Sequence, residues 1–180
     1  IIKLTACVYR PWIRDSRVIP AGNSKFTATG YSFPSGHSTN ATSFYGSLAG
    51  WQNKKRMWLS CCFVVMIFLT MFSRNYLGVH TPQDVFVGLF ATVIVLVLNY
   101  FIFKWFEKNQ NKDILILIVG VVLCVAGIIY INLKSYPIDY VDGQMIVNPV
   151  DMMPDTYKAI GMFLGFIACI GFAPSATCAT

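Results

Sequence analysis

Three long stretches without a charged residue most constrain what this chain can fold into. They cover residues 57–72, 85–103 and 114–133. A helix rises about 1.5 Å per residue, so roughly 20 apolar residues cross a hydrocarbon core of about 30 Å. The second and third stretches predict membrane-spanning helices by length alone. The first is short, but Trp58 and Tyr76 are placed to anchor its ends in the membrane interface.

Two further segments predict helices of the same bundle. Residues 35–51 are rich in Ser, Thr, Ala and Gly and are barely long enough to cross a membrane. Small residues favour a helix packed inside a bundle, and the alternative is an amphipathic surface helix. Residues 159–172 form a last, glycine-rich span that Pro174 cuts short. The sequence therefore predicts an all-α integral membrane helical bundle.

The composition agrees with a membrane protein and narrows its partners. Apolar residues make up 56% of the chain and charged residues 12%, with a net charge of +6. The basic residues lie in short clusters between apolar runs, which favours an anionic substrate and anionic lipid head groups and gives no reason to expect nucleic acid. The cysteines lie mostly inside apolar runs and form no Cys-x-x-Cys pair, so we predict neither a zinc site nor a disulfide framework.

Polar segments connect the predicted helices. Residues 1–10 are expected to be the end of a helix, which Pro11 terminates because the residue before a proline avoids the helical region. The chain starts without Met, so we expect a fragment whose helix began earlier. Residues 134–158 are expected to be a solvated loop with a small hairpin that turns at Asp142-Gly143.

Both histidines of the chain lie where a polar loop turns into an apolar helix. The first occurs in Pro34-Ser35-Gly36-His37, and the second in Ser73-Arg74-x5-His80-x3-Asp84. Upstream, Lys3 and Arg10-Pro11 have the seven-residue spacing at which two side chains share a helix face. These residue types match what phosphoryl transfer requires.

A phosphoryl group in transfer spreads negative charge over three equatorial oxygens, which cations and N–H donors stabilise. Lys3, Arg10 and Arg74 supply the cations. The Ser35 hydroxyl and the amides that open the next helix supply donors, and Gly36 lets the backbone approach closely. We predict a phosphate site here.

The second motif predicts the nucleophile. Thr81-Pro82 is typical of a helix start, which places Asp84 four residues after His80, within reach of one imidazole nitrogen. That bond would fix the tautomer and leave the other nitrogen free to attack. We therefore predict that His80 forms a phosphohistidine, while His37 protonates the leaving oxygen and then activates water. No clustered metal ligands occur, so neither a metal nor another cofactor is predicted, and a metal-dependent phosphatase is disfavoured.

Together the three patterns resemble the signature of the type 2 phosphatidic acid phosphatase (PAP2) family, whose superfamily also contains the vanadium haloperoxidases. The resemblance implies the same catalytic roles for His80, His37 and Asp84. It also implies further spans before the first motif and a site facing away from the cytoplasm. The phosphate-binding positions that it implies are Lys3, Arg10, Ser35, Gly36 and Arg74.

The predicted organisation is a PAP2-like core over residues 1–106 and an additional C-terminal transmembrane pair over 107–180. The basic turn 52–56 and the polar turn 104–113 are expected on one side of the membrane, and the motifs and the loop 134–158 on the other. The density of Lys and Arg makes the short turns cytoplasmic, so the site of this cell-membrane protein is expected on the extracytoplasmic side.

The leading hypothesis is a metal-independent phosphatase whose partners are membrane lipids and a lipid phosphate or lipid diphosphate substrate. Phosphatidic acid, phosphatidylglycerol phosphate, an isoprenyl diphosphate and a sphingoid phosphate share the same head-group chemistry and stay open. A catalytically silent lipid-binding or transport protein is the alternative from another class, and the intact His80, His37 and Asp84 disfavour it. A vanadate-dependent haloperoxidase is disfavoured by the predicted spans, because that branch is typically soluble.

Overall fold

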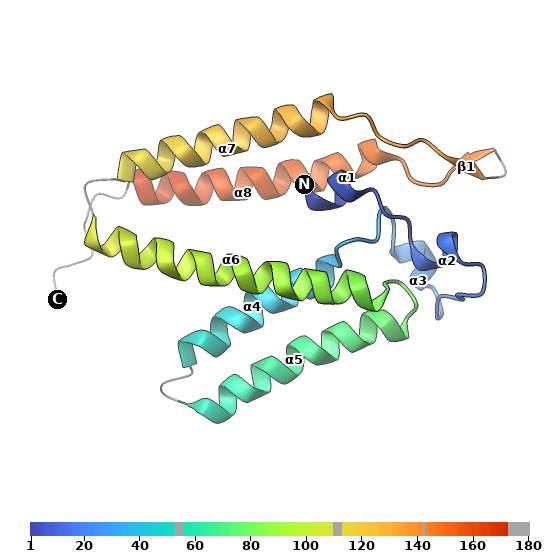
Figure 1. Cartoon of the computed structure of the whole chain (residues 1–180), viewed down its shortest axis with the longest axis horizontal. Helices are drawn as coiled ribbons and strands as arrows, with labels where there is room; N and C mark the ends of the chain where they lie inside the picture. The colour runs from blue at the N-terminus through green and yellow to red at the C-terminus, as the bar shows by residue number, and fades with distance from the viewer. Residues whose placement is uncertain (53–55, 110–112, 142, 173–180) are drawn as a thin grey trace. The chain divides into compact units, whose positions relative to one another are not determined.

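The computed structural model describes residues 1–52, 56–109, 113–141 and 143–172, which are mostly helical. The chain divides into two compact units, one of residues 6–99 with Ile2, the other of residues 100–180 with Ile1 and residues 3–5. In chain order the elements are α1 (Ile2–Ala6), α2 (Pro11–Arg14), α3 (Ser24–Thr27), α4 (Gly36–Gln52), α5 (Met57–Tyr76), α6 (Pro82–Lys108), α7 (Asp113–Leu133), β1 (Tyr140–Val141), β2 (Gln144–Met145), the 3-10 helix η2 (Pro149–Met152) and α8 (Met153–Phe172) (Figure 1).

Helices α4 and α6 begin at capping residues that belong to the motifs. The hydroxyl of Ser35 accepts a hydrogen bond from the N–H of Ser38 at 3.4 Å. Thr81 and Asp84 form a reciprocal capping box: the Thr81 N–H donates to Asp84 Oδ2 at 2.8 Å, and the Asp84 N–H donates to Thr81 Oγ1 at 3.3 Å. Pro82 takes the first helical position, where a missing N–H costs nothing.

A small apolar core holds α4, α5 and α6 together. Ile67 and Met71 of α5 are buried against Val85 of α6, and Tyr45 of α4 and Leu89 of α6 pack around them. Fully burying such a side chain stabilises a fold by about 1.5–3 kcal/mol relative to leaving it exposed to water. The contact between α4 and α5 is extensive, and the two helices lie side by side (Figure 1).

Helix α6 approaches α4 closely at glycines. A Cβ on Gly88 would lie 3.1 Å from the carbonyl oxygen of Ser35 and 3.3 Å from the Cβ of Ser38. A Cβ on Gly46 of α4 would lie 3.1 Å from Cδ1 of Leu96. Glycine at such positions lets two backbones pack closely, as is common between membrane helices. The first turns of α4 and α6 are therefore held against one another.

The second unit is built on the helix pair α7 and α8 (Figure 1). The pair also packs closely at a glycine, since a Cβ on Gly120 would lie 2.5 Å from Cδ1 of Ile167. The connection between the two helices contains the predicted hairpin, in which Tyr140 pairs with Met145 in an antiparallel register. Gly143 in its turn has a φ of 75°, which glycine adopts without strain.

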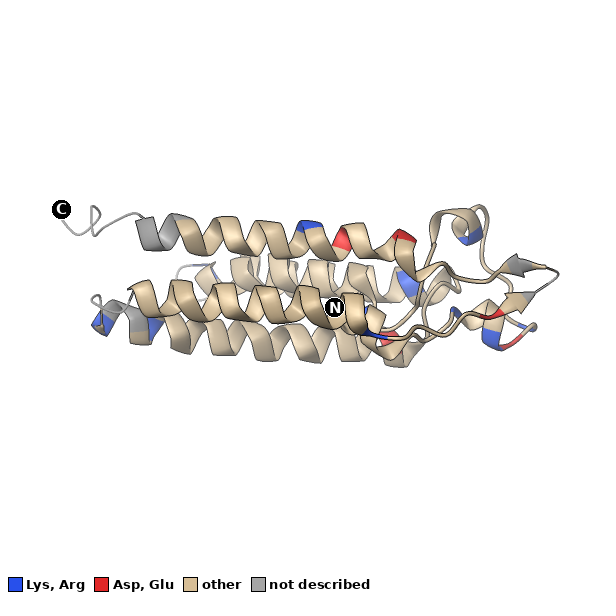
Figure 2. Cartoon of the chain, turned by 90° about the horizontal axis from the view of Figure 1, so that it is seen from above, with Lys and Arg blue, Asp and Glu red and all other residues tan. Residues whose placement is uncertain are grey.

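Within the described ranges, three helices are long and apolar enough to cross a membrane. They are Met57–Tyr76, Pro82–Trp105 and Ile114–Leu133, with mean hydropathies of 1.8, 2.5 and 3.2. Lys, Arg, Asp and Glu gather near the helix ends and in the connections (Figure 2). Apolar side chains such as Phe90, 60% exposed, and Ile94, 59% exposed, would meet lipid. The predicted all-α membrane bundle is confirmed.

The first ten residues differ from the prediction. Helix α1 ends at Ala6, because Cys7 adopts a left-handed φ of 49° that interrupts the helix. Arg10 is extended, and Pro11 begins α2 where we expected it to end a longer helix. The prediction that Lys3 and Arg10 lie on one face of a continuous helix is therefore wrong.

Three helices are longer than predicted, and one of them, α6, continues to Lys108 through the first part of the predicted polar turn 104–113. Helix α5 continues to Tyr76 and carries Ser73 and Arg74 on its last turns. Helix α8 begins at Met153, before the predicted span of residues 159–172, and its first turns carry Asp155 and Lys158. It is not one of the three helices that are long and apolar enough to cross a membrane. Pro154 and an acidic residue both suit a first helical turn.

Several predicted features lie outside the described residues, namely residues 53–55 of the basic turn, residues 110–112 of the polar turn, Asp142 of the hairpin turn and Pro174.

Replacing Gly88 by alanine is expected to lower the thermal stability of the protein, because the new methyl group would lie 3.1 Å from the Ser35 carbonyl. Gly50 of α4 is the matched control, since nothing lies within 4 Å of a Cβ added there. Alanine at Gly50 should stabilise by about 0.5–1 kcal/mol, the usual difference within a helix. Melting of both variants in detergent micelles checks this. An equal gain at both positions would contradict the close approach of α4 and α6.

Candidate active site

Side chains from three segments meet around the ring of His80, which is 5% exposed. Arg10 precedes α2, Ser32 lies in the loop before α4, and Asp84 is on the first turn of α6. Arg10 Nη1 lies 3.0 Å from His80 Nε2, and Ser32 Oγ lies 3.3 Å from His80 Nδ1. Asp84 Oδ2 lies 3.5 Å from the same Nδ1. All four residues are buried.

Arg10 determines which nitrogen of His80 carries the proton. A guanidinium group can only donate hydrogen bonds, so His80 Nε2 must accept, and the ring proton of the neutral imidazole lies on Nδ1. The protonated Nδ1 then faces the two oxygens of Ser32 and Asp84. The lone pair on Nε2 is the electron pair that a nucleophilic histidine needs.

The carboxylate of Asp84 is held by several donors. Its Oδ2 accepts hydrogen bonds from the Thr81 N–H at 2.8 Å and from the Ser32 hydroxyl. Its backbone carbonyl accepts a hydrogen bond from the Ser35 N–H at 2.9 Å. The last bond joins the starts of α4 and α6, so the segments carrying the two histidine motifs are tied through Asp84.

Arg10 is embedded among backbone carbonyls. Its Nε donates to Gly30 at 3.1 Å, its Nη2 to Thr29 at 3.0 Å and its Nη1 to Val79 at 2.9 Å. With the contact to His80, four of its five N–H groups are engaged by the protein. Burial lowers the pKa of Arg10 to about 10, and the charge of Asp84 opposes this. Arg10 therefore stays charged at neutral pH, and one N–H remains for a phosphate oxygen.

Arg74 contrasts with Arg10. It is half-buried near the end of α5, and its Nε donates to Ser73 Oγ at 3.3 Å. Within the part of the chain that the structure describes, the terminal nitrogens of Arg74 have no hydrogen-bond partner. Of the two arginines in this unit's motifs, Arg74 therefore has more donors to offer an anion.

The remaining predicted residues lie in different settings. His37 is exposed on the first turn of α4, and Gly36 is half-buried where that helix starts. Ser35 is buried, and its N–H is engaged by Asp84, so this amide does not serve an anion in the present arrangement. Lys3 is half-buried in α1 and belongs to the second compact unit, so its contact with phosphate stays a prediction.

Sequence reasoning missed Ser32. It is 1% exposed and touches both His80 and Asp84, which follow it by 48 and 52 positions. It lies two residues before Pro34, outside the motif pattern, so its type and spacing gave no signal. Only the fold brings it to the site, where its backbone N–H donates to the carbonyl of Val8 at 2.7 Å.

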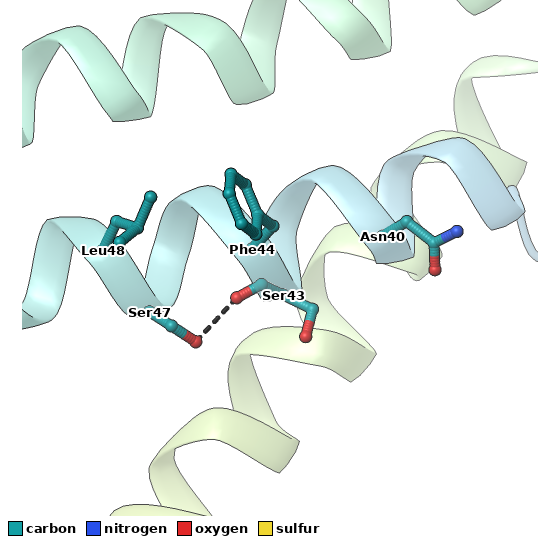
Figure 3. A pocket seen from close by; sticks show the side chains of 5 residues that line it. All are labelled: Asn40, Ser43, Phe44, Ser47 and Leu48. Atoms are coloured by element: carbon teal, nitrogen blue, oxygen red, sulfur yellow. Dashed lines mark hydrogen bonds between the residues drawn. The ribbon is translucent and has the colours of Figure 1, made fainter. Parts of the chain in front are cut away.

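A pocket of about 440 Å³ lies along α4 (Figure 3). Asn40, which lines this pocket, follows His37 by three positions, so the two residues lie on the same side of α4. Within the pocket the Ser47 hydroxyl donates to the carbonyl of Ser43 at 2.6 Å (Figure 3). The pocket is lined by Asn40, Ser43, Phe44, Ser47 and Leu48.

A family model described as the PAP2 superfamily matches residues 1–111, more than half of the chain. The chain belongs to the PAP2 superfamily. The match spans every predicted site residue and ends before α7, and it confirms the resemblance drawn from the motifs. Membership of this superfamily supports phosphatase-type activity in broad terms. Comparisons with curated proteins and with solved structures found no match.

Replacing Arg10 by alanine is expected to destabilise this PAP2 domain by at least about 2 kcal/mol, because three carbonyls, one of them in a buried hydrogen bond, lose their donor and the buried Asp84 loses its nearby cation. The carbonyls concerned are those of Thr29, Gly30 and Val79. Arg14 is exposed and serves as the control, for which a change within about 0.5 kcal/mol is expected. Unfolding of both variants in micelles measures the difference. Equal stability of the two variants would show that the hydrogen bonds of Arg10 do not stabilise the segments before α4 and α6.

Proposed function

We propose that this chain is a metal-independent phosphatase that hydrolyses a lipid phosphate or lipid diphosphate through a phosphohistidine on His80. The observation that carries the proposal is the contact of Arg10 Nη1 with His80 Nε2 at 3.0 Å, from which we infer that the ring proton lies on Nδ1 and the lone pair on Nε2. Membership of a superfamily of phosphatases supports the same chemistry.

In the first step, the Nε2 lone pair attacks phosphorus, the Nε2–P bond forms and the ester P–O bond breaks. His37, as the imidazolium, gives its proton to the departing oxygen. Arg10 has to release Nε2 before the attack, and its charge then lies beside the phosphoryl oxygens. The ring becomes positively charged when Nε2 bonds to phosphorus, and the nearby Asp84 carboxylate stabilises that charge.

In the second step, His37 is neutral and takes a proton from water as the water oxygen attacks phosphorus. The P–Nε2 bond breaks, inorganic phosphate leaves, and His80 regains its lone pair. In both steps the negative charge on the equatorial oxygens is met by cations, which is the main requirement of phosphoryl transfer. Arg74 and Arg10 supply that charge from this unit, and Lys3 is the third proposed cation.

The surroundings of the site support a substrate carried by the bilayer. Arg74 lies near the end of the apolar helix α5, and His80 lies two residues before the apolar helix α6. A lipid can therefore keep its tail in the hydrocarbon while its head group reaches the cations. The pocket along α4 offers space for the group next to the phosphate. The density of basic residues in the short turns supports a site on the extracytoplasmic side.

Purified protein in micelles is expected to release inorganic phosphate from at least one of phosphatidic acid, phosphatidylglycerol phosphate, an isoprenyl diphosphate and a sphingoid phosphate. Release should be unaffected by EDTA. His80→Ala should reduce it by at least about a thousandfold, as loss of a nucleophile does, whereas the exposed Arg14→Ala should not. Activity that EDTA removes and magnesium restores would overturn metal independence. Lipid binding without phosphate release would favour a silent lipid-binding protein.

The pH profile of kcat/KM should be bell-shaped, because the mechanism needs His80 neutral and His37 protonated at the same time. Unperturbed histidines titrate at about 6.5, so both limbs are expected within about one or two units of neutral pH. Initial rates measured between about pH 5 and about pH 9 test this. A flat profile over that range is incompatible with a pair of histidines in opposite states.

A further inference from the structure

The Ser32 hydroxyl lies closer to His80 Nδ1 than the Asp84 carboxylate does. Ser32 Oγ lies 3.3 Å from Nδ1, whereas Asp84 Oδ2 lies 3.5 Å away. The same hydroxyl donates its hydrogen bond to Asp84 Oδ2. We propose that Ser32 is a positioning residue that bridges the two: His80 Nδ1–H donates to Ser32 Oγ, and Ser32 Oγ–H donates to Asp84 Oδ2.

The direction of this bridge is set at both ends. At one end Arg10 donates to Nε2, which places the single ring proton on Nδ1. At the other end the ionised carboxylate of Asp84 can only accept, and it also accepts from the Thr81 N–H. A hydroxyl between them has one proton, which goes to Asp84, and a lone pair, which is left for Nδ1–H. Each proton then has one acceptor.

The surroundings keep the bridge in place. Ser32 is 1% exposed, so water does not compete for its hydroxyl. Its backbone N–H is bonded to the carbonyl of Val8 at 2.7 Å, which fixes the segment on which the side chain stands. In such a dry site a hydrogen bond between a neutral group and a charged one is stronger than in water. The ring orientation of His80 therefore depends on a hydroxyl that is not part of the recognised motifs.

The effect on catalysis rests on the proposed function, in which Nε2 attacks phosphorus. Without the hydroxyl, the ring loses the acceptor that holds its plane and its proton. When the lost hydrogen bond belongs to a series that ends on a charged carboxylate, its free energy corresponds to a fall in kcat of about 10- to 100-fold. KM should change little, because Ser32 lies on the Nδ1 side of the ring, away from the attacking nitrogen.

The chain has two histidines, so isotope-labelled imidazole nitrogens can be followed by NMR in micelles, with His37→Gln used to assign the signals. Wild type should show His80 protonated on Nδ1. Ser32→Ala should shift His80 towards a mixture of tautomers and lower kcat, and Ser32→Thr should restore both. Ser32→Cys keeps the size with a weaker hydrogen-bonding group and should be intermediate; it replaces the alanine variant if that does not fold.

Ser38→Ala is the matched control. Ser38 is 0% exposed like its neighbour Ser35, but its hydroxyl has no hydrogen-bond partner among the described residues. Its loss should alter neither the His80 signals nor kcat. The proposal is overturned if Ser32→Ala leaves the tautomer and kcat unchanged, which would mean that Asp84 holds the ring directly. An intact tautomer response in a protein that releases no phosphate would refute the proposed function and leave the bridge standing.

Discussion

A buried carboxylate is the constraint on which this site depends. Asp84 is 2% exposed, and an ionised carboxyl group is stable away from water only when donors and a nearby cation compensate it. The Thr81 N–H and the Ser32 hydroxyl supply the donors. The Arg10 guanidinium, on the far side of the His80 ring, supplies the positive charge. The imidazole is thus held between two buried opposite charges, which fixes its protonation more firmly than either neighbour alone.

The same carboxylate also starts a helix. Asp84 is the third residue of α6 and closes the capping box with Thr81, so local hydrogen bonds help to set its position. The close approach at Gly88 then places the start of α4 against the start of α6. The site is therefore built from the first turns of α4 and α6 and from the loop before α4, whose backbone carbonyls bind Arg10. Packing between the apolar helices holds those first turns together.

Local patterns in the sequence predicted much of this. Charge-free runs predicted the apolar helices because burial in lipid imposes that composition, and Thr81-Pro82 predicted the start of α6 because caps act within a few residues. The break at Cys7 was not predictable, because a left-handed conformation at a cysteine has no local signature. Ser32 was missed since its partners follow it by 48 and 52 positions. The three backbone carbonyls that bind Arg10 were equally invisible, because any residue can supply a carbonyl.

The contact between Arg10 and Nε2 has a consequence for selectivity. On the proposed mechanism, Nε2 attacks phosphorus, but in the resting protein its lone pair accepts a hydrogen bond from Arg10, so an incoming group must first displace the guanidinium. A phosphomonoester can do so, because its anionic oxygens are better acceptors for a cationic N–H than a neutral imidazole is. An uncharged phosphotriester or carboxylic ester offers no such exchange. On the proposed mechanism, the same arginine therefore occupies Nε2 until an anionic group displaces it, which keeps the neutral carboxylic esters of the bilayer from reacting with His80.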